Sequence, residues 1–140
     1  MPDLVLGGGE TLRRYLARQG KDLRFHAEEG RFELVAILPG AERPAAELSC
    51  AVLLLWEDGA ETWLNCIRAE QAVSCGFAPQ NTLTPASTEP GHSVVTVQRE
   101  LLRPDGRFIW PQDVPLPEEW SGFPLPEQLI LVGLRLLGTI

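Results

Sequence analysis

The chain has 140 residues, a formal net charge of −7 at pH 7, 44% hydrophobic residues and 22% charged residues. This length and ordinary composition are typical of a single globular domain, residues 1–140, with a core of its own. The acidic charge argues against non-specific binding to nucleic acid or anionic membranes, because both attract basic surfaces.

The N-terminus lacks a signal-peptide pattern, and no apolar run approaches the roughly 20 residues of a membrane-spanning helix. Three cysteines, an odd number, lie in apolar stretches. Buried, reduced thiols fit this pattern better than a secreted disulfide framework. We therefore expect a cytoplasmic protein that neither spans a membrane nor binds nucleic acid.

Residues 1–9 are expected to form a flexible start before a short amphipathic helix from Glu10 to Gln19, which Gly20 would end. The glycines at 7–9 could let backbone N–H groups hold a phosphate. The match to known phosphate loops is poor, and Glu10 in the first turn would repel an anion. We expect a lead-in to the helix rather than a phosphate site.

The most apolar stretch runs from Ser49 to Trp56 and is followed by Asp58-Gly59 and a second apolar run, 60–68. Asp-Gly between two such runs is a strong signal for a β-hairpin with a type I′ turn. The side chains on both faces of this hairpin are apolar. In a sheet with one face exposed to solvent, apolar and polar residues should alternate along each strand. The hairpin is therefore expected in the middle of a sheet that is covered on both sides.

The register of this turn decides which side chains share a face, since successive residues of a strand point to opposite faces. With two loop residues, Leu53 lies opposite Leu64, and Cys50 and Cys66 point to opposite faces. A shift of the turn by one residue would change this register and overturn the assignment of Cys50 and Cys66 to opposite faces.

Two further hairpins are expected, one pairing 23–27 with 32–38 and the other pairing 93–102 with 107–110. Residues 69–77 are expected to form a short helix. The segment 78–92 is rich in Pro, Thr and Ser, which predicts a long loop and a place to look for a partner contact.

Residues 110–126 are rich in proline and aromatic residues, which predicts an extended strap that neither continues the sheet nor forms a helix. Its aromatics either cover the core or stand exposed for a partner, and we favour the cover. The C-terminal segment 126–138 is apolar nearly all round and predicts a buried helix, with a strand as the alternative.

Together these elements predict an α+β fold, with an antiparallel sheet of about six strands in three consecutive hairpins. An N-terminal and a C-terminal helix would pack on that sheet. Two short helices can cover only one face of such a sheet. A strap, another subunit or a client protein would then cover the second face, and a homodimer is the simplest arrangement.

No catalytic motif, metal-binding cluster or cofactor-binding motif stands out, so we lean towards a non-enzyme without cofactor or metal. The preferred hypothesis is a small cytoplasmic protein-binding module of the chaperone, adaptor or inhibitor type. It would present apolar surface to a protein partner or to a second copy. The candidate partner-binding residues are Trp110, Trp120, Phe123, Leu131 and Leu134.

The alternative is a small-molecule-binding protein or a small enzyme with an apolar pocket between the sheet and the helices. Trp63, Asn65, Cys75 and His92 are the candidates for lining that pocket. The other histidine, His26, is expected at the surface. A third class, an acidic mimic of nucleic acid, would need carboxylates aligned on one surface.

Overall fold

The computed structural model describes residues 2–19, 22–26, 28–87, 89 and 93–140, and over these residues the fold is α+β. Eight strands form a mixed, mostly parallel sheet in the order β10-β7-β6-β5-β4-β3-β1-β2. They are β1 (Asp3–Leu6), β2 (Leu23–Arg24), β3 (Gly30–Ile37), β4 (Leu48–Trp56), β5 (Ile67–Cys75), β6 (Leu83–Ser87), β7 (Val94–Val97) and β10 (Gln112–Pro115). The prediction of a purely antiparallel sheet of six strands is therefore wrong.

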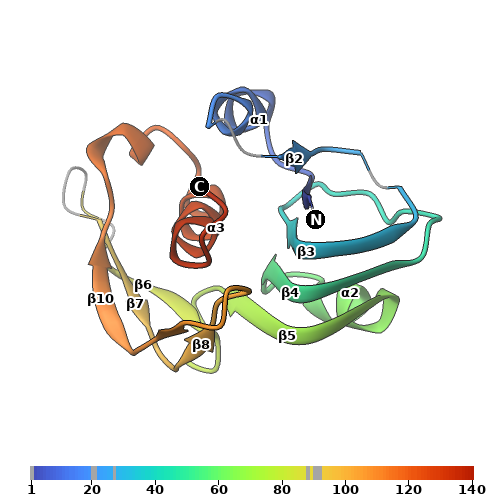
Figure 1. The fold of residues 1–140 in the computed structure, drawn as a ribbon. Helices are drawn as coiled ribbons and strands as arrows, with labels where there is room; N and C mark the ends of the chain where they lie inside the picture. The colour runs from blue at the N-terminus through green and yellow to red at the C-terminus, as the bar shows by residue number, and fades with distance from the viewer. Residues whose placement is uncertain (1, 20–21, 27, 88, 90–92) are drawn as a thin grey trace.

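The remaining elements lie around this sheet (Figure 1). A small antiparallel sheet consists of β8 (Leu101–Leu102) and β9 (Phe108–Ile109). The helices are α1 (Glu10–Ala17), α2 (Ala60–Cys66) and α3 (Leu125–Leu136), with a 3-10 turn at Glu118–Trp120. The helices predicted at 10–19 and 126–138 are thus confirmed, although α1 ends at Ala17 and α3 ends at Leu136.

Strand β4 lies inside the sheet, between β3 and β5, and pairs with both in parallel. Its side chains Val52, Leu54 and Trp56 belong to one buried cluster, together with α1 and α3. The neighbouring Leu53 and Leu55 belong to a second cluster, on the opposite face. Figure 1 shows the sheet curving around α3, and we call the face towards α3 the inner face and the other the outer face.

The outer face of β4 is covered by the chain itself. Helix α2 places Ala60, Trp63 and Cys66 against the outer cluster, and Ala41 from the connection between β3 and β4 adds to this cover. The spacing of three residues puts these α2 side chains on one side of the helix. No second subunit is needed to keep the outer face of β4 dry.

The predicted central hairpin is wrong, because β4 and β5 run in parallel and α2 connects them. A type I′ turn needs positive φ at both central residues. Gly59 has φ +76°, but among the described residues only glycines have positive φ, so Asp58 does not. Gly59 instead precedes the first residue of α2, and the Asp58 carboxylate accepts a hydrogen bond from Trp56 Nε1 at 3.2 Å.

The assignment of Cys50 and Cys66 to opposite faces was tied to that hairpin and is corrected with it. Cys50 is buried in the outer cluster, and Cys66 packs against the same cluster from α2. All three cysteines are free thiols.

The predicted pairing of 23–27 with 32–38 is also wrong. Strand β1 lies between β2 and β3 and is parallel to both. Within the start that was expected to be flexible, 1–9, Asp3–Leu6 form β1, and the buried Leu4 and Val5 are part of the sheet.

Three further segments differ from their predictions. Residues 69–75 belong to β5 instead of a helix, and the expected loop 78–92 contains β6. The strap 110–126 contributes β10 and a 3-10 turn, although proline was expected to exclude both. Proline is compatible with β10 because β10 is an edge strand, where one side of the backbone needs no partner.

The pairing of β4 in this fold predicts effects of very different size on stability for substitutions of two leucines. Leu54 is fully buried, so Leu54→Ala should lower the free energy of unfolding by about 2–5 kcal/mol. Leu64 is 48% exposed on α2, so Leu64→Ala should change it by no more than about 0.5 kcal/mol. Urea unfolding of both variants measures the difference. Equal losses would indicate that Leu64 is packed in the sheet, as the hairpin predicts.

Candidate functional site

The structure separates the five predicted partner-binding residues by exposure. Trp110 is 64% exposed, whereas Trp120, Leu131 and Leu134 are buried and Phe123 is partly buried against the inner cluster. Trp110 alone among the five is therefore available as a surface residue.

Trp120 packs within the core and is not exposed to a partner. Its indole Nε1 donates a hydrogen bond to the Tyr15 hydroxyl at 2.9 Å, and the Arg135 guanidinium lies 4.4 Å from its ring centroid. Phe123 packs against the same Tyr15, with ring centroids 5.7 Å apart. These contacts join α1, the strap and α3, as the covering role of the strap predicts.

The predicted pocket residues are not brought together. Cys75 is buried in the inner cluster, while Trp63 packs against the outer cluster on the opposite face of the sheet. Asn65 is exposed on α2. His92 lies outside the described residues. A shared pocket lined by Trp63 and Cys75 would have to cross the sheet.

The most distinctive surface is one face of the β8–β9 hairpin. Leu101 and Ile109 face the inner cluster, and their neighbours point the other way. Leu102 and Phe108 form a cross-strand pair on that outward side, and the rings of Phe108 and Trp110 are 6.3 Å apart. Leu102, Phe108 and Trp110 are 40%, 52% and 64% exposed, and we call this group the aromatic face.

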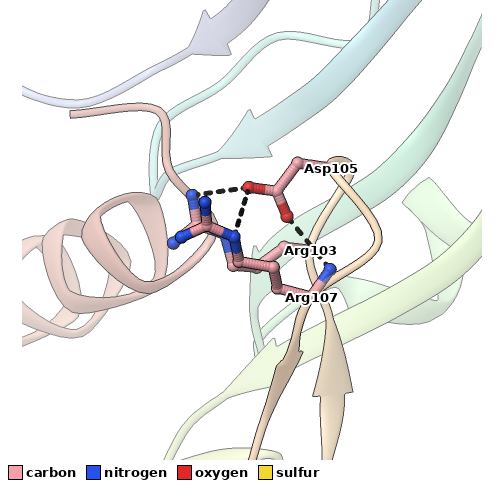
Figure 2. A network of polar contacts seen from close by, with 3 residues as sticks. All are labelled: Arg103, Asp105 and Arg107. Atoms are coloured by element: carbon pink, nitrogen blue, oxygen red, sulfur yellow. Dashed lines mark hydrogen bonds and ion pairs between the residues drawn. The ribbon is translucent and has the colours of Figure 1, made fainter.

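A polar network holds the turn of this hairpin (Figure 2). Asp105 accepts the backbone N–H of Arg107 at 3.1 Å and forms ion pairs with the guanidinium groups of Arg103 at 3.0 Å and Arg107 at 3.7 Å. The backbone N–H of Arg107 and the charge of Arg103 keep the pKa of the Asp105 carboxyl below its usual value. The turn is thus closed by a carboxylate that stays ionised at neutral pH.

The hairpin is also attached to the main sheet. The Gln71 side chain on β5 donates to the Leu102 carbonyl at 2.7 Å and accepts from the Leu102 N–H at 2.9 Å. This amide pair and the packing of Leu101 fix the orientation of the hairpin. The contacts of Gln71 and Leu101 therefore hold the hairpin with its aromatic face towards solvent. Little conformational entropy is lost when a face held in this way binds a partner.

Strand β10, which follows Trp110, is protected against strand addition. The Leu116 N–H points inward to the Ser93 carbonyl at 3.0 Å. Backbone N–H groups alternate in direction along a strand, so the nitrogen of Pro115 points to the open edge, where it carries no hydrogen. An added strand would meet a missing donor there, which favours recognition through side chains.

Sequence reasoning found Trp110 but missed Leu102 and Phe108. The signal was present in the Pro104-Asp105-Gly106 turn, since the predicted return of 107–110 sets the pairing register. That register places Leu102 opposite Phe108, and strand alternation adds Trp110 to their side.

The part of the chain that the structure describes holds no group of three or more His, Cys, Asp or Glu side chains placed to bind a metal ion. Within the same segments, none of the helices combines the length and the apolar character that crossing a bilayer requires. The chain matches no known protein-family model, no curated protein and no solved structure. The functional argument therefore rests on the residues themselves.

The burial of the cysteines predicts their reactivity. Burial raises the pKa of the Cys50 thiol to about 11 and raises the pKa of the Cys75 thiol further still, so both stay protonated at neutral pH. Cys66 is partly exposed. Alkylation of the native protein by iodoacetamide, followed by peptide mass spectrometry, should modify Cys66 well before the other two. Labelling of Cys75 at the rate of Cys66 would contradict this packing.

Proposed function

We propose that this chain is a non-enzymatic protein-binding module that uses its aromatic face as the contact surface. The supporting observation is the pair Phe108 and Trp110, which are more than half exposed on a hairpin held by its own ion pairs. Large aromatic side chains dominate binding energy at protein interfaces. Nothing in the fold requires this pair to face water, since Leu101 and Ile109 provide the packing.

The size of the aromatic face favours a short segment of another protein over a stable dimer. Aromatic side chains bury about 150–250 Å² each, so the exposed parts of Phe108 and Trp110, with the smaller exposed part of Leu102 added, amount to roughly 300 Å². A standard interface takes about 800 Å² from each partner. A homodimer stays a prediction, but its original reason, an uncovered second face of the strand at 49–56, is absent because α2 packs on that face of β4.

The net charge of the whole chain favours a basic partner, while the turn beside the aromatic face carries both signs of charge, on Arg103, Arg107 and Asp105. A net charge of −7 attracts positively charged segments and raises their rate of association. An apolar or arginine side chain of such a segment can stack on the Trp110 ring, as Arg135 does on Trp120 within this chain. We therefore propose a basic peptide segment that carries an apolar anchor, in an adaptor or inhibitor type of interaction.

The proposed compartment is the cytoplasm. Three free thiols, two of them buried, fit a reducing environment. The protonated thiols of Cys50 and Cys75 are poor nucleophiles, which supports a role in packing instead of catalysis.

A peptide-display selection on the purified protein tests the proposal. Enriched peptides should carry net positive charge and an apolar anchor, and Trp110→Ala or Phe108→Ala should weaken them about tenfold or more. Leu64→Ala removes an exposed leucine elsewhere and should change the affinity by less than about twofold. Fluorescence titration of each variant measures the affinities.

Two outcomes would overturn the proposal. One is the absence of any enriched peptide family that binds the native protein. The other is a set of enriched peptides that bind Trp110→Ala and Phe108→Ala as tightly as the unchanged chain.

A further inference from the structure

The parallel part of the sheet contains a point where the chain changes direction. After β1 the chain passes through α1 to β2 on one side, and then crosses to β3 on the other side of β1. In open parallel sheets, ligands bind outside the carboxyl ends of the strands at such a switch point, because the connections there leave towards opposite faces.

The connections after β1 and β3 do diverge in this way. Helix α1 packs Leu12 and Leu16 into the inner cluster, whereas Ala41, which follows β3, packs into the outer cluster. A cavity of about 380 Å³ opens between them, with Gly8 on one connection and Gly40 on the other in its lining. This volume falls in the range of small-molecule sites.

Basic side chains from three elements line this cavity. Arg13 comes from α1, His26 from the segment after β2, and Arg43 from the connection after β3. Glu42 is the one carboxylate in the lining. A basic cavity on a chain of net charge −7 is a local reversal of charge, which favours an anionic ligand.

Among the described residues, neither arginine of the cavity takes part in a salt bridge, a property that Arg13 and Arg43 share with four other arginines of the chain. Ion pairs are instead formed by Arg14, Arg24, Arg31, Arg103 and Arg107. The guanidinium groups of Arg13 and Arg43 therefore keep their donors for a ligand.

The glycine segment itself is not the anion site. The Gly8 N–H donates to the Pro39 carbonyl at 3.2 Å, and the Gly9 N–H donates to the Glu127 carboxylate at 3.1 Å. Glu127 thus occupies the place that a phosphate would take at the start of α1. Recognition in the cavity has to come from side chains.

We propose that this cavity binds a phosphate monoester of mononucleotide size, with the phosphate held by Arg13, Arg43 and His26. Donors that line one cavity from three different elements suit a tetrahedral phosphate with three acceptor oxygens better than a carboxylate with two. Phe25, partly buried at the cavity wall, offers a flat apolar surface to the body of the ligand. The site lies on a different part of the sheet from the aromatic face, so it is an additional function.

Isothermal titration calorimetry with AMP tests the site. Arg13→Gln and Arg43→Gln should each raise the Kd for AMP about tenfold or more, since each removes a charged hydrogen-bond donor. Arg18→Gln removes the same charge from the exposed end of α1, outside the cavity lining, and should change the Kd less than about twofold. Glu42→Gln removes a repulsive carboxylate and should tighten binding about threefold.

The same titrations can overturn the proposal. Absence of saturable AMP binding up to about 10 mM would remove the site. An equal rise in the Kd for AMP in Arg18→Gln and Arg13→Gln would indicate diffuse electrostatic attraction to the surface instead of binding in the cavity. Tighter binding of citrate than of AMP would contradict the assignment to a phosphate ester. All the substituted side chains are exposed, and circular dichroism confirms that the variants are folded.

Discussion

The whole structure depends on one constraint, the burial of β4 on both faces. Three successive leucines, Leu53, Leu54 and Leu55, are almost fully buried, and each contributes about 1.5–3 kcal/mol relative to an exposed side chain. A strand of this kind needs cover above and below. Parallel pairing supplies it, because the crossover connection places α2 on the outer face while α3 fills the inner face.

The sequence predicts the burial of β4 but not the direction of its neighbour. Leu-Leu-Leu is apolar in either topology, and Asp58-Gly59 suits the start of a helix as well as a hairpin turn. The conformation of Asp58 decides between them, since a type I′ turn needs a positive φ that Asp58 does not have. Its carboxylate instead accepts a hydrogen bond from Trp56 Nε1, two residues earlier in the chain. Short segments of about seven residues, such as 60–66, are also where helix and strand periods are hardest to separate.

The two proposed functional surfaces differ in how much of each can be predicted from the sequence. The aromatic face is local, since the turn at 104–106 sets the register of Phe108, and only its exposure needed the structure. The cavity is non-local. It exists because β1 lies between β2 and β3 in the sheet. The sequence does not predict β1 as a strand, because β1 has only four residues and glycines follow it directly. Neither surface includes the hairpin that was predicted from the apolar runs 49–56 and 60–68.

The direction of β5 relative to β4 tests this account most directly, and NOE spectroscopy of the isotopically labelled protein measures it. The parallel register predicts cross-strand NOEs between residues 52–55 and 71–74, together with helical contacts within 60–66. NOEs that join 51–55 to 62–66, with Leu53 next to Leu64, would restore the hairpin. That result would contradict both the self-covered sheet and the sites derived from it.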